Sequence, residues 1–399
     1  MILTAGAVGA TAAVLPGGAT VASNKLKTGF VFDARAVRGV DTGTPGGIFP
    51  ADPAKLFFPA HHYENAATKL EIFTLLDAAG IVPQLQRIQA RRATRRELLR
   101  AHSAAHIDKI NEISGRERGG FGDAEQTTPI GHNGHILAEL AFGGAINLAE
   151  AVWEQRVRNG YMLMRPPGHH ATRDQAMGFC TYNNLAGAAH ALLAKGAKRI
   201  LIVDTDVHTG NGTQDIFWDD PRVVIVDVHQ AECFPPGLGH TDMRGSKKNI
   251  LNLDLLPGTG HETAMYAFEK VIGPVVRRFN PEIILVASGF DSGITDPLGR
   301  FMFGPATYAE MTKRLMQLAD NRTCRGRVAM FHEGGYDELS TPHYGRKVIA
   351  QLAGISTDFE TPLDAVFEWQ SKGQKPKFLA LLREMVDEVA AFVPEIPAH

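Results

Sequence analysis

Cysteine is scarce in this sequence. Three cysteines, Cys180, Cys233 and Cys324, occur in 399 residues, and no two of them form a CxxC pair. So few cysteines exclude a disulfide framework. We expect a reduced protein with ordinary buried thiols.

The chain also lacks an excess of charge of either sign. It has 41 Lys and Arg against 43 Asp and Glu, which gives a formal net charge of −2. No global field therefore attracts DNA or an anionic membrane, and we expect neither a nucleic-acid nor a membrane partner. Six arginines gather between residues 87 and 100, where a solvated helix face is favoured over a polyanion-binding patch.

Long hydrophobic runs are missing as well. The nearest approach is residues 1–23, a run of small apolar residues that Pro16, Gly17 and Gly18 interrupt, so it is too poor to span a bilayer. No basic region of a secretory signal precedes it. We expect residues 1–24 to be a disordered tail in a cytoplasmic protein. The alternative is the apolar part of a twin-arginine export signal, which would send the protein to the periplasm.

Short apolar runs dominate the rest of the chain, which we expect to form one domain over residues 25–399. A first strand is predicted at 28–33. Later runs, four or five residues long and not alternating with polar residues, lie at 161–164, 200–203, 223–226, 283–287 and 328–331. Strands buried on both faces have this pattern. Helical segments are predicted at 66–79, 133–154, 183–195, 262–279, 305–319, 337–352 and 375–392. This alternation predicts a single large α/β domain, a mostly parallel central sheet with helices on both faces.

Polar side chains beside glycines follow five of these runs. The segments are RPPGHHA, DTDVHTGNGTQ, DVHQAECFPPGLG, SGFDSGITDPLG and HEGGYDE. Ligands of parallel sheets bind outside the carboxyl ends of the strands. One shared site at this edge is therefore the economical explanation.

Two carboxylates and one imidazole are candidate metal ligands. Asp206 and His208 are two residues apart at a strand end, so their side chains point to the same side. By themselves they are better explained by an ion pair or a turn cap, but Asp291 at a second strand end reverses that preference. Three protein ligands leave one position open, as in a catalytic zinc site.

Two adjacent histidines and a tyrosine are candidate catalytic residues. His169 and His170 are interpreted as proton carriers, because histidine titrates near neutrality. Asp204 is expected to hydrogen-bond one imidazole and raise its basicity, and Asn211 to hold the other. The Tyr336 phenol follows two glycines and can stabilise an oxyanion, although a tyrosine packed in the core is the simpler alternative.

These segments resemble the signature segments of the histone deacetylase superfamily, which includes bacterial acetylpolyamine amidohydrolases and class II-like deacetylases. The likeness runs from about residue 28 to 350. It implies an arginase-like α/β fold and a zinc-dependent amide hydrolase. Carried over by motif, Asp206, His208 and Asp291 match the zinc ligands, His169 and His170 the paired histidines, Tyr336 the carbonyl-polarising tyrosine, and Gly178, Phe179 and Phe234 the channel wall.

Three departures from the family pattern accompany this likeness. Thr209 stands where a second histidine is usual, and Asn211 where some members have Asp. Asp227 occupies a position often held by Ser, beside a potassium site that the resemblance implies around Asp204, Asp206 and His208.

Alternatives in substrate and activity remain open at this point. The chain could hydrolyse another small amide or acyl compound, bind an acyl ligand without cleaving it, or be a ureohydrolase with two metals. Acetyl-lysine and acetylated polyamines both fit a narrow channel. Rim loops at 34–63 and 115–132 would choose between them, and His61, His62, Asp123 and Glu125 could contact a cationic substrate or be simply solvated. A homo-oligomer is possible, since a second subunit narrows the channel in the acetylpolyamine branch.

Overall fold

A computed structural model describes residues 26–37, 62–356 and 362–398 of the chain, without the Leu363 side chain. Within these residues eight parallel strands form one sheet in the order β2-β1-β5-β10-β9-β6-β7-β8. The strands are β1 (Gly29–Val31), β2 (Gln86–Arg87), β5 (Gly160–Met162), β6 (Ile200–Asp204), β7 (Val223–Gln230), β8 (Ile250–Leu255), β9 (Ile283–Ser288) and β10 (Val328–His332). The predicted α/β class and parallel sheet are confirmed.

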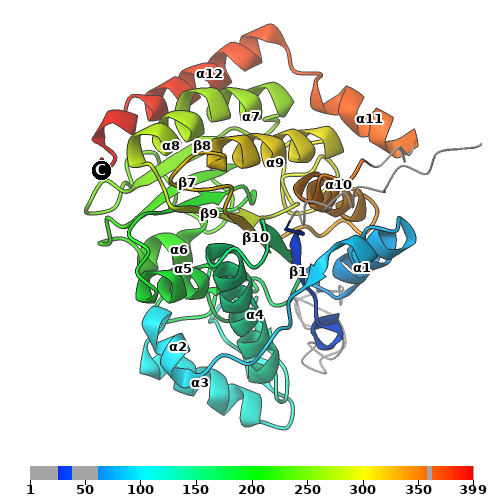
Figure 1. Cartoon of the computed structure of the whole chain (residues 1–399), viewed down its shortest axis with the longest axis vertical. Coiled ribbons are helices and arrows are strands. Elements are labelled where there is room, and N and C mark those ends of the chain that lie inside the picture. Colours follow the sequence, from blue (N-terminus) through cyan, green and yellow to red (C-terminus); the bar gives the residue numbers. More distant parts are fainter. Residues whose placement is uncertain (1–25, 38–61, 357–361, 399) are drawn as a thin grey trace, which may run out of the picture.

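Helices cover both faces of the sheet (Figure 1). One face carries α2 (Arg95–Ala101), α3 (Ala104–Gly115), α4 (His135–Trp153), α5 (Asn184–Ala194) and α6 (Asn211–Ile216). The other carries α1 (Ala67–Ala78), α7 (His261–Ala267), α8 (Gly273–Phe279), α9 (Pro305–Ala319), α10 (Thr341–Ala353) and α12 (Pro376–Ala390), with α11 (Pro362–Ser371) beside α9. Short helical turns lie at Ala34–Val37, Val82–Gln84 and Val393–Glu395. A separate antiparallel pair joins β3 (Gly120–Phe121) to β4 (Pro129–Ile130).

The central strands are apolar up to their carboxyl ends because each of their faces packs against helices. In β6, Leu201 and Val203 join the core under α7–α10, whereas Ile200 and Ile202 join the core under α4 and α5. Successive side chains of a strand point to opposite faces, so no polar alternation is possible here. This explains why the unbroken apolar runs identified β6, β7, β9 and β10 in the sequence.

Elements with weaker apolar patterns escaped prediction. The edge strand β8 has the sequence ILNLDL, in which polar residues interrupt the apolar ones. It therefore lacks the unbroken apolar run from which the central strands were predicted. Helices α3, α6 and α11 and strands β2, β3 and β4 were also not predicted. The predicted helix at 262–279 is α7 and α8 joined by a π-helical turn, Phe268–Ile272.

Two earlier expectations fall wholly or partly outside the described residues. They are the nature of residues 1–24 and much of the rim loop at 34–63, including His61. Among the described helices, α4 alone is long and apolar enough to cross a bilayer, but most of its length is buried against α5 and the sheet. A core helix of a globular domain has the same properties.

A capping box lies at the start of α2, and it should stabilise the domain. The Thr94 hydroxyl accepts the Glu97 N–H, and the Glu97 carboxylate accepts the Thr94 N–H. We expect Thr94→Ala to lower the free energy of unfolding by about 1 kcal/mol in urea titrations. Thr74→Ala, at an exposed position inside α1, is the matched control and should cause no loss, because alanine is the better helix former. Equal losses in both variants would contradict the capping argument.

Candidate metal centre and active site

The carboxyl edge of the sheet gathers the side chains that the sequence placed at separate strand ends. Strand β6 leads into Asp206 and His208, and β9 leads into Asp291. Strand β10 leads into Tyr336, and the turn after β5 carries His169 and His170. Neighbouring parallel strands end at the same edge, which brings residues more than 150 positions apart into one site.

Asp206, His208 and Asp291 form one buried group. Nδ1 of His208 lies 3.0 Å from Oδ1 of Asp206 and 3.1 Å from Oδ2 of Asp291. One ligand atom from each residue lies within 4.8 Å of the other two, and all three side chains are buried. Two carboxylate oxygens and one imidazole nitrogen are a donor set that suits zinc, with one position left for a substrate or water.

Glycine is required beside this group because the backbone approaches the carboxylates closely. The Gly334 N–H donates to Oδ2 of Asp206 at 2.8 Å. A Cβ atom added at Gly334 would lie 2.0 Å from Oδ2 of Asp291. Any other residue would push β10 away from the candidate metal ligands, which gives the first glycine of the EGGY segment a physical reason.

A second buried group, His169, Cys180 and Glu333, also brings three donor atoms within 4.8 Å. It suits a metal less well. Burial raises the pKa of the Cys180 thiol well above its usual value, so the ligating thiolate is disfavoured. Oε2 of Glu333 already accepts the N–H groups of Gly168 and His169, at 2.6 and 3.1 Å. Glu333 therefore braces the turn that carries the two histidines.

The paired histidines have different partners. Nδ1 of His169 lies 3.1 Å from Oδ2 of Asp204, and Nδ1 of His170 lies 2.7 Å from Oδ1 of Asn211. The two rings lie side by side, with centroids 4.0 Å apart. Both expected hydrogen bonds are present, one to a charged partner and one to a neutral partner.

This difference separates the proton affinities of the two imidazoles. Burial would lower the pKa of His169, but the neighbouring Asp206 and Asp204 carboxylates outweigh it and raise that pKa to about 10. Burial lowers the pKa of His170 well below its usual value, and the adjacent His169 and His208 add to that effect. One ring thus holds a proton while its neighbour is free to accept one.

Tyr336 lies beside the candidate metal ligands Asp206, His208 and Asp291, in an acidic, buried environment. Its backbone N–H donates to Oδ2 of Asp296 at 2.8 Å, and its ring meets Phe179 edge to face at 5.6 Å. Burial raises the pKa of the phenol well above its usual value, and the Asp291 and Asp206 carboxylates raise it further. The phenol is therefore a neutral hydrogen-bond donor.

An apolar cavity leads to these groups. Its lining consists of Thr127, His170, Gly178, Phe179, His208, Cys233, Phe234, Leu298 and Tyr336. Gly178 has φ +52°, and a Cβ atom there would lie 2.4 Å from the His170 ring and 2.8 Å from Phe234. The three predicted channel residues, Gly178, Phe179 and Phe234, therefore all lie on the wall.

Asp227 is buried close to this site but has its own partners. Its carboxylate accepts the Gly210 N–H at 2.9 Å and the Gln214 amide at 2.7 Å. Nδ1 of His229 lies 2.7 Å from its other oxygen. Asp227 fits the predicted potassium site less well than the metal group fits zinc, because three donors already surround its carboxylate.

Several residues of the site were not singled out in the sequence. Glu333 and Asp296 hold the backbone at His169 and Tyr336, and Thr127, Cys233 and Leu298 line the cavity. A signal for Glu333 was available, since an acidic residue rarely interrupts the junction of a buried strand and two glycines without a partner. No comparable signal marks the others, because only the folded loops bring them to the cavity.

The rim residues proposed as contacts for a cationic substrate divide into three cases. His62 is partly buried, with ring nitrogens 3.0 Å from the Glu64 carbonyl and 3.2 Å from the Thr127 carbonyl. Asp123 accepts hydrogen bonds from the backbone of Thr127 and Thr128, so it shapes the loop. Glu125 is exposed.

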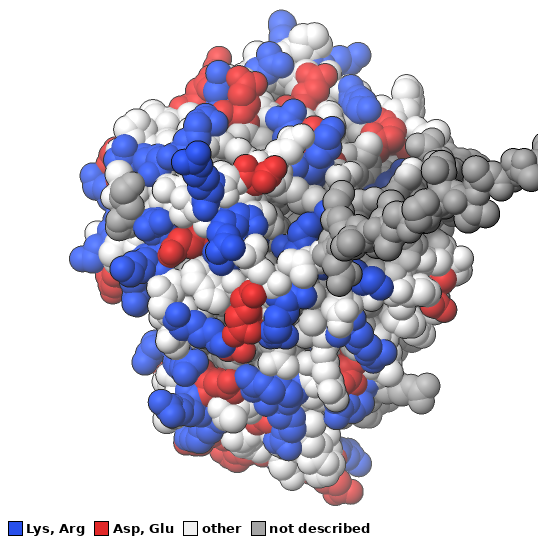
Figure 2. Space-filling view, in the orientation of Figure 1, with Lys and Arg blue, Asp and Glu red and all other residues white. Residues whose placement is uncertain are grey.

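Several of the clustered arginines form ion pairs with acidic side chains of the same chain. Arg91, Arg92 and Arg95 pair with Glu97, Glu139 and Asp108, respectively. On the face seen in Figure 2, basic and acidic side chains are interspersed. This favours the solvated-helix interpretation of the cluster.

Comparison with known proteins identifies clear relatives. The family model for the histone deacetylase domain matches residues 62–352. The chain is 37% identical over 344 residues to the histone deacetylase-like amidohydrolase of Pseudomonas aeruginosa, covering 85% of this chain and 89% of that protein. It is 36% identical over 268 residues to a probable deacetylase of Archaeoglobus fulgidus, covering 66% and 73% of the two chains. The crystal structure of the HDA15 HD domain superposes with a TM-score of 0.77 at 31% identity, over 93% of this chain and 98% of that one.

The geometry predicts one metal ion per chain, held by the Asp206 group. We expect Asp291→Ala to lose the bound divalent metal in elemental analysis of the purified protein, because two ligands remain where three are needed. Cys180→Ala, which removes a donor of the second group, is the control and should keep one ion per chain. Metal retained by Asp291→Ala but lost by Cys180→Ala would overturn the assignment.

Proposed function

The chain belongs to the histone deacetylase family, and from this premise we propose that it is a zinc-dependent deacetylase of acetylated amines. Its relatives in this family are named amidohydrolase and probable deacetylase, so the chain is an enzyme that hydrolyses amides. The observation that carries the zinc proposal is the buried group of Asp206, His208 and Asp291 beside an apolar cavity that His170 and Tyr336 also line.

Zinc is the metal that the donor set favours. A bound zinc ion would lower the pKa of a coordinated water toward ~7 and polarise the carbonyl of the substrate. The apolar side chains of Phe179, Phe234 and Leu298 on the cavity wall lower the local polarity, which strengthens electrostatic effects inside the cavity. A potassium ion near Asp204, Asp206, His208 and Asp227 stays a prediction that the family resemblance implies.

The two histidines move the protons. His170 lines the cavity and its ring is neutral, so we assign it the role of accepting the proton of the attacking water. His169, charged through its contacts with Asp204 and Asp206, supplies positive charge and a proton for the leaving amine. Their partners Asp204 and Asn211 orient the rings through Nδ1, which leaves Nε2 of His170 for this exchange and places Nε2 of His169 3.8 Å from Oδ1 of Asp206.

Tyr336 stabilises the charge that develops on the substrate oxygen. Its hydroxyl is a neutral donor in a buried site, where a hydrogen bond to an oxyanion is worth far more than in water. Asp296 and Phe179 fix its backbone and ring before the substrate binds, so little reorganisation is needed during the reaction.

A narrow cavity with aromatic walls fits the methylene chain of acetyl-lysine or an acetylated polyamine. The other activities considered from the sequence are less well supported. A non-catalytic acyl-binding module does not need the complete set of metal ligands, histidines and tyrosine. A two-metal ureohydrolase needs a larger carboxylate cluster than the two carboxylates, Asp206 and Asp291, that lie beside His208. Partners, a homo-oligomer and the cellular location stay predictions.

Removal of the Tyr336 hydroxyl should slow catalysis with little effect on the fold. We expect Tyr336→Phe to lower kcat by ~10²-fold or more, equivalent to about 3 kcal/mol of transition-state stabilisation. Steady-state kinetics of the purified variant measure this. Tyr266→Phe, at a half-buried position on α7 where the hydroxyl donates to Asp387, is the matched control. Unchanged turnover in Tyr336→Phe would remove the proposed role.

A substrate panel tests the proposed activity and its metal together. The panel contains acetyl-lysine peptides, acetylated polyamines and simple acetanilides, and acetate release is measured. We expect at least one class to be hydrolysed, chelation to abolish the activity, and added zinc to restore it. Hydrolysis that persists in chelator would refute zinc dependence, and the absence of acetate release from every class would refute deacetylation of these amines.

A further inference from the structure

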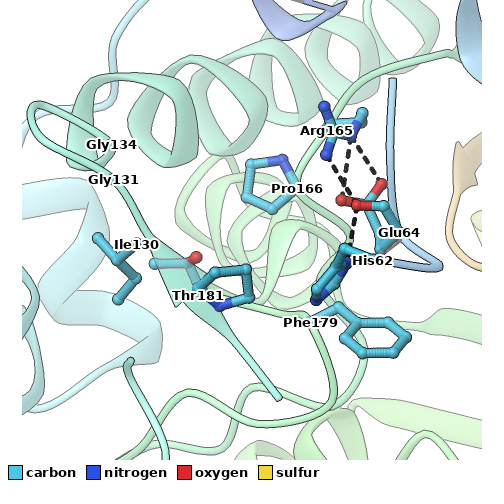
Figure 3. A pocket seen from close by; sticks show the side chains of 10 residues that line it. His62, Glu64, Ile130, Gly131, Gly134, Arg165, Pro166, Phe179 and Thr181 are labelled. Atoms are coloured by element: carbon cyan, nitrogen blue, oxygen red, sulfur yellow. Dashed lines mark hydrogen bonds and ion pairs between the residues drawn. The ribbon is translucent and has the colours of Figure 1, made fainter. Parts of the chain in front are cut away.

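Three charged side chains are buried together behind Tyr336, outside the groups used above. Lys69 in the first turn of α1, Glu64 just before that helix and Arg165 after β5 are only 1%, 4% and 2% exposed. The Lys69 ammonium lies 3.0 Å from Oε1 of Glu64. Nε of Arg165 donates to both oxygens of the same carboxylate, at 2.8 and 3.0 Å. Figure 3 shows the Glu64 carboxylate directed at Arg165, with His62 and Phe179 nearby.

The charges of this cluster do not balance. Two cations share one carboxylate, and burying an uncompensated charge is costly. Arg165 and Glu64 already form a neutral pair, and Arg165 also donates to the Glu64 carbonyl at 2.9 Å. Lys69 is therefore the surplus cation, and further compensation must come from another side.

The active site supplies that compensation. The Lys69 ammonium lies 5.9 Å from the centre of the Tyr336 ring, within cation–π range. Burial lowers the pKa of Lys69 below its usual value, and the neighbouring Glu64 and Asp291 carboxylates oppose that shift. Phe179 meets the same tyrosine ring edge to face, and Asp296 holds its backbone. Tyr336 is thus fixed by three contacts, and Lys69 provides the cationic one.

We propose that Lys69, held by Glu64 and Arg165, is a positioning residue that keeps the Tyr336 hydroxyl aligned for the oxyanion. This inference rests on the proposed function, because it concerns the efficiency of the same reaction. Lys69 touches no reacting atom and acts only through the tyrosine ring. A hydrophobic residue of similar volume can often replace a surplus buried ion without loss of stability, which leaves catalysis as the reason we propose for this charge.

A double-mutant cycle tests the dependence on Tyr336. We expect Lys69→Met to lower kcat by ~10-fold with KM changed less than twofold, while the free energy of unfolding stays equal or rises. In the Tyr336→Phe background the same substitution should change kcat less than twofold, because the hydroxyl that Lys69 positions is gone. Lys195→Met, which removes a surface ion pair with Glu154, is the control and should leave kcat unchanged.

Two results would overturn the proposal. One is an unchanged kcat in Lys69→Met, and the other is an equal loss in both backgrounds. If Lys69→Met does not fold, Lys69→Gln gives the same cycle with a neutral residue that can still hydrogen-bond to Glu64.

A spectroscopic measurement separates this proposal from the proposed function. The chain has seven tyrosines, so fluorotyrosine labelling gives a tractable fluorine NMR spectrum. The Tyr336 resonance is the one missing in Tyr336→Phe. We expect Lys69→Met to shift that resonance more than any other, even if no substrate is ever found. A Tyr336 resonance that does not move would refute the contact, whatever the activity of the enzyme.

Discussion

Buried negative charge at the carboxyl edge of the sheet is the constraint on which the site depends. Asp204, Asp206, Asp291, Asp296 and Glu333 all lie out of solvent around one small volume. Carboxylates in such a place must be neutralised or hydrogen-bonded, because bare burial costs far more than a folded domain can supply. Imidazoles and backbone N–H groups supply part of this compensation, and the proposed divalent cation would complete it.

The sheet makes this concentration of charge possible. Strands β6, β9 and β10 are neighbours and contribute apolar residues to both cores, so their ends are held rigidly together. Glycine at position 334 then lets the backbone itself donate to a ligand carboxylate. Stability comes from the apolar strands, and the polar chemistry is confined to the segments just beyond them.

Charge is also balanced behind the site. The cluster of Lys69, Glu64 and Arg165 presents a net positive charge toward Tyr336. Arg165 precedes the turn that carries His169 and His170, so the same cluster contacts two parts of the candidate site. A buried ion cluster of this kind contributes more to geometry than to stability.

The sequence by itself determined the sheet class, its central strands and most of the residues that gather in the candidate site. Unbroken apolar runs identify strands buried on both faces, and the segments after them contain Asp206, His208, Asp291, His169, His170 and Tyr336. Only the tertiary structure decided the partners of Glu333, the place of Asp227 and the position of Lys69 next to the tyrosine. Those contacts join residues separated by tens to hundreds of positions, and no local pattern encodes a distance that is set by how helices and strands pack.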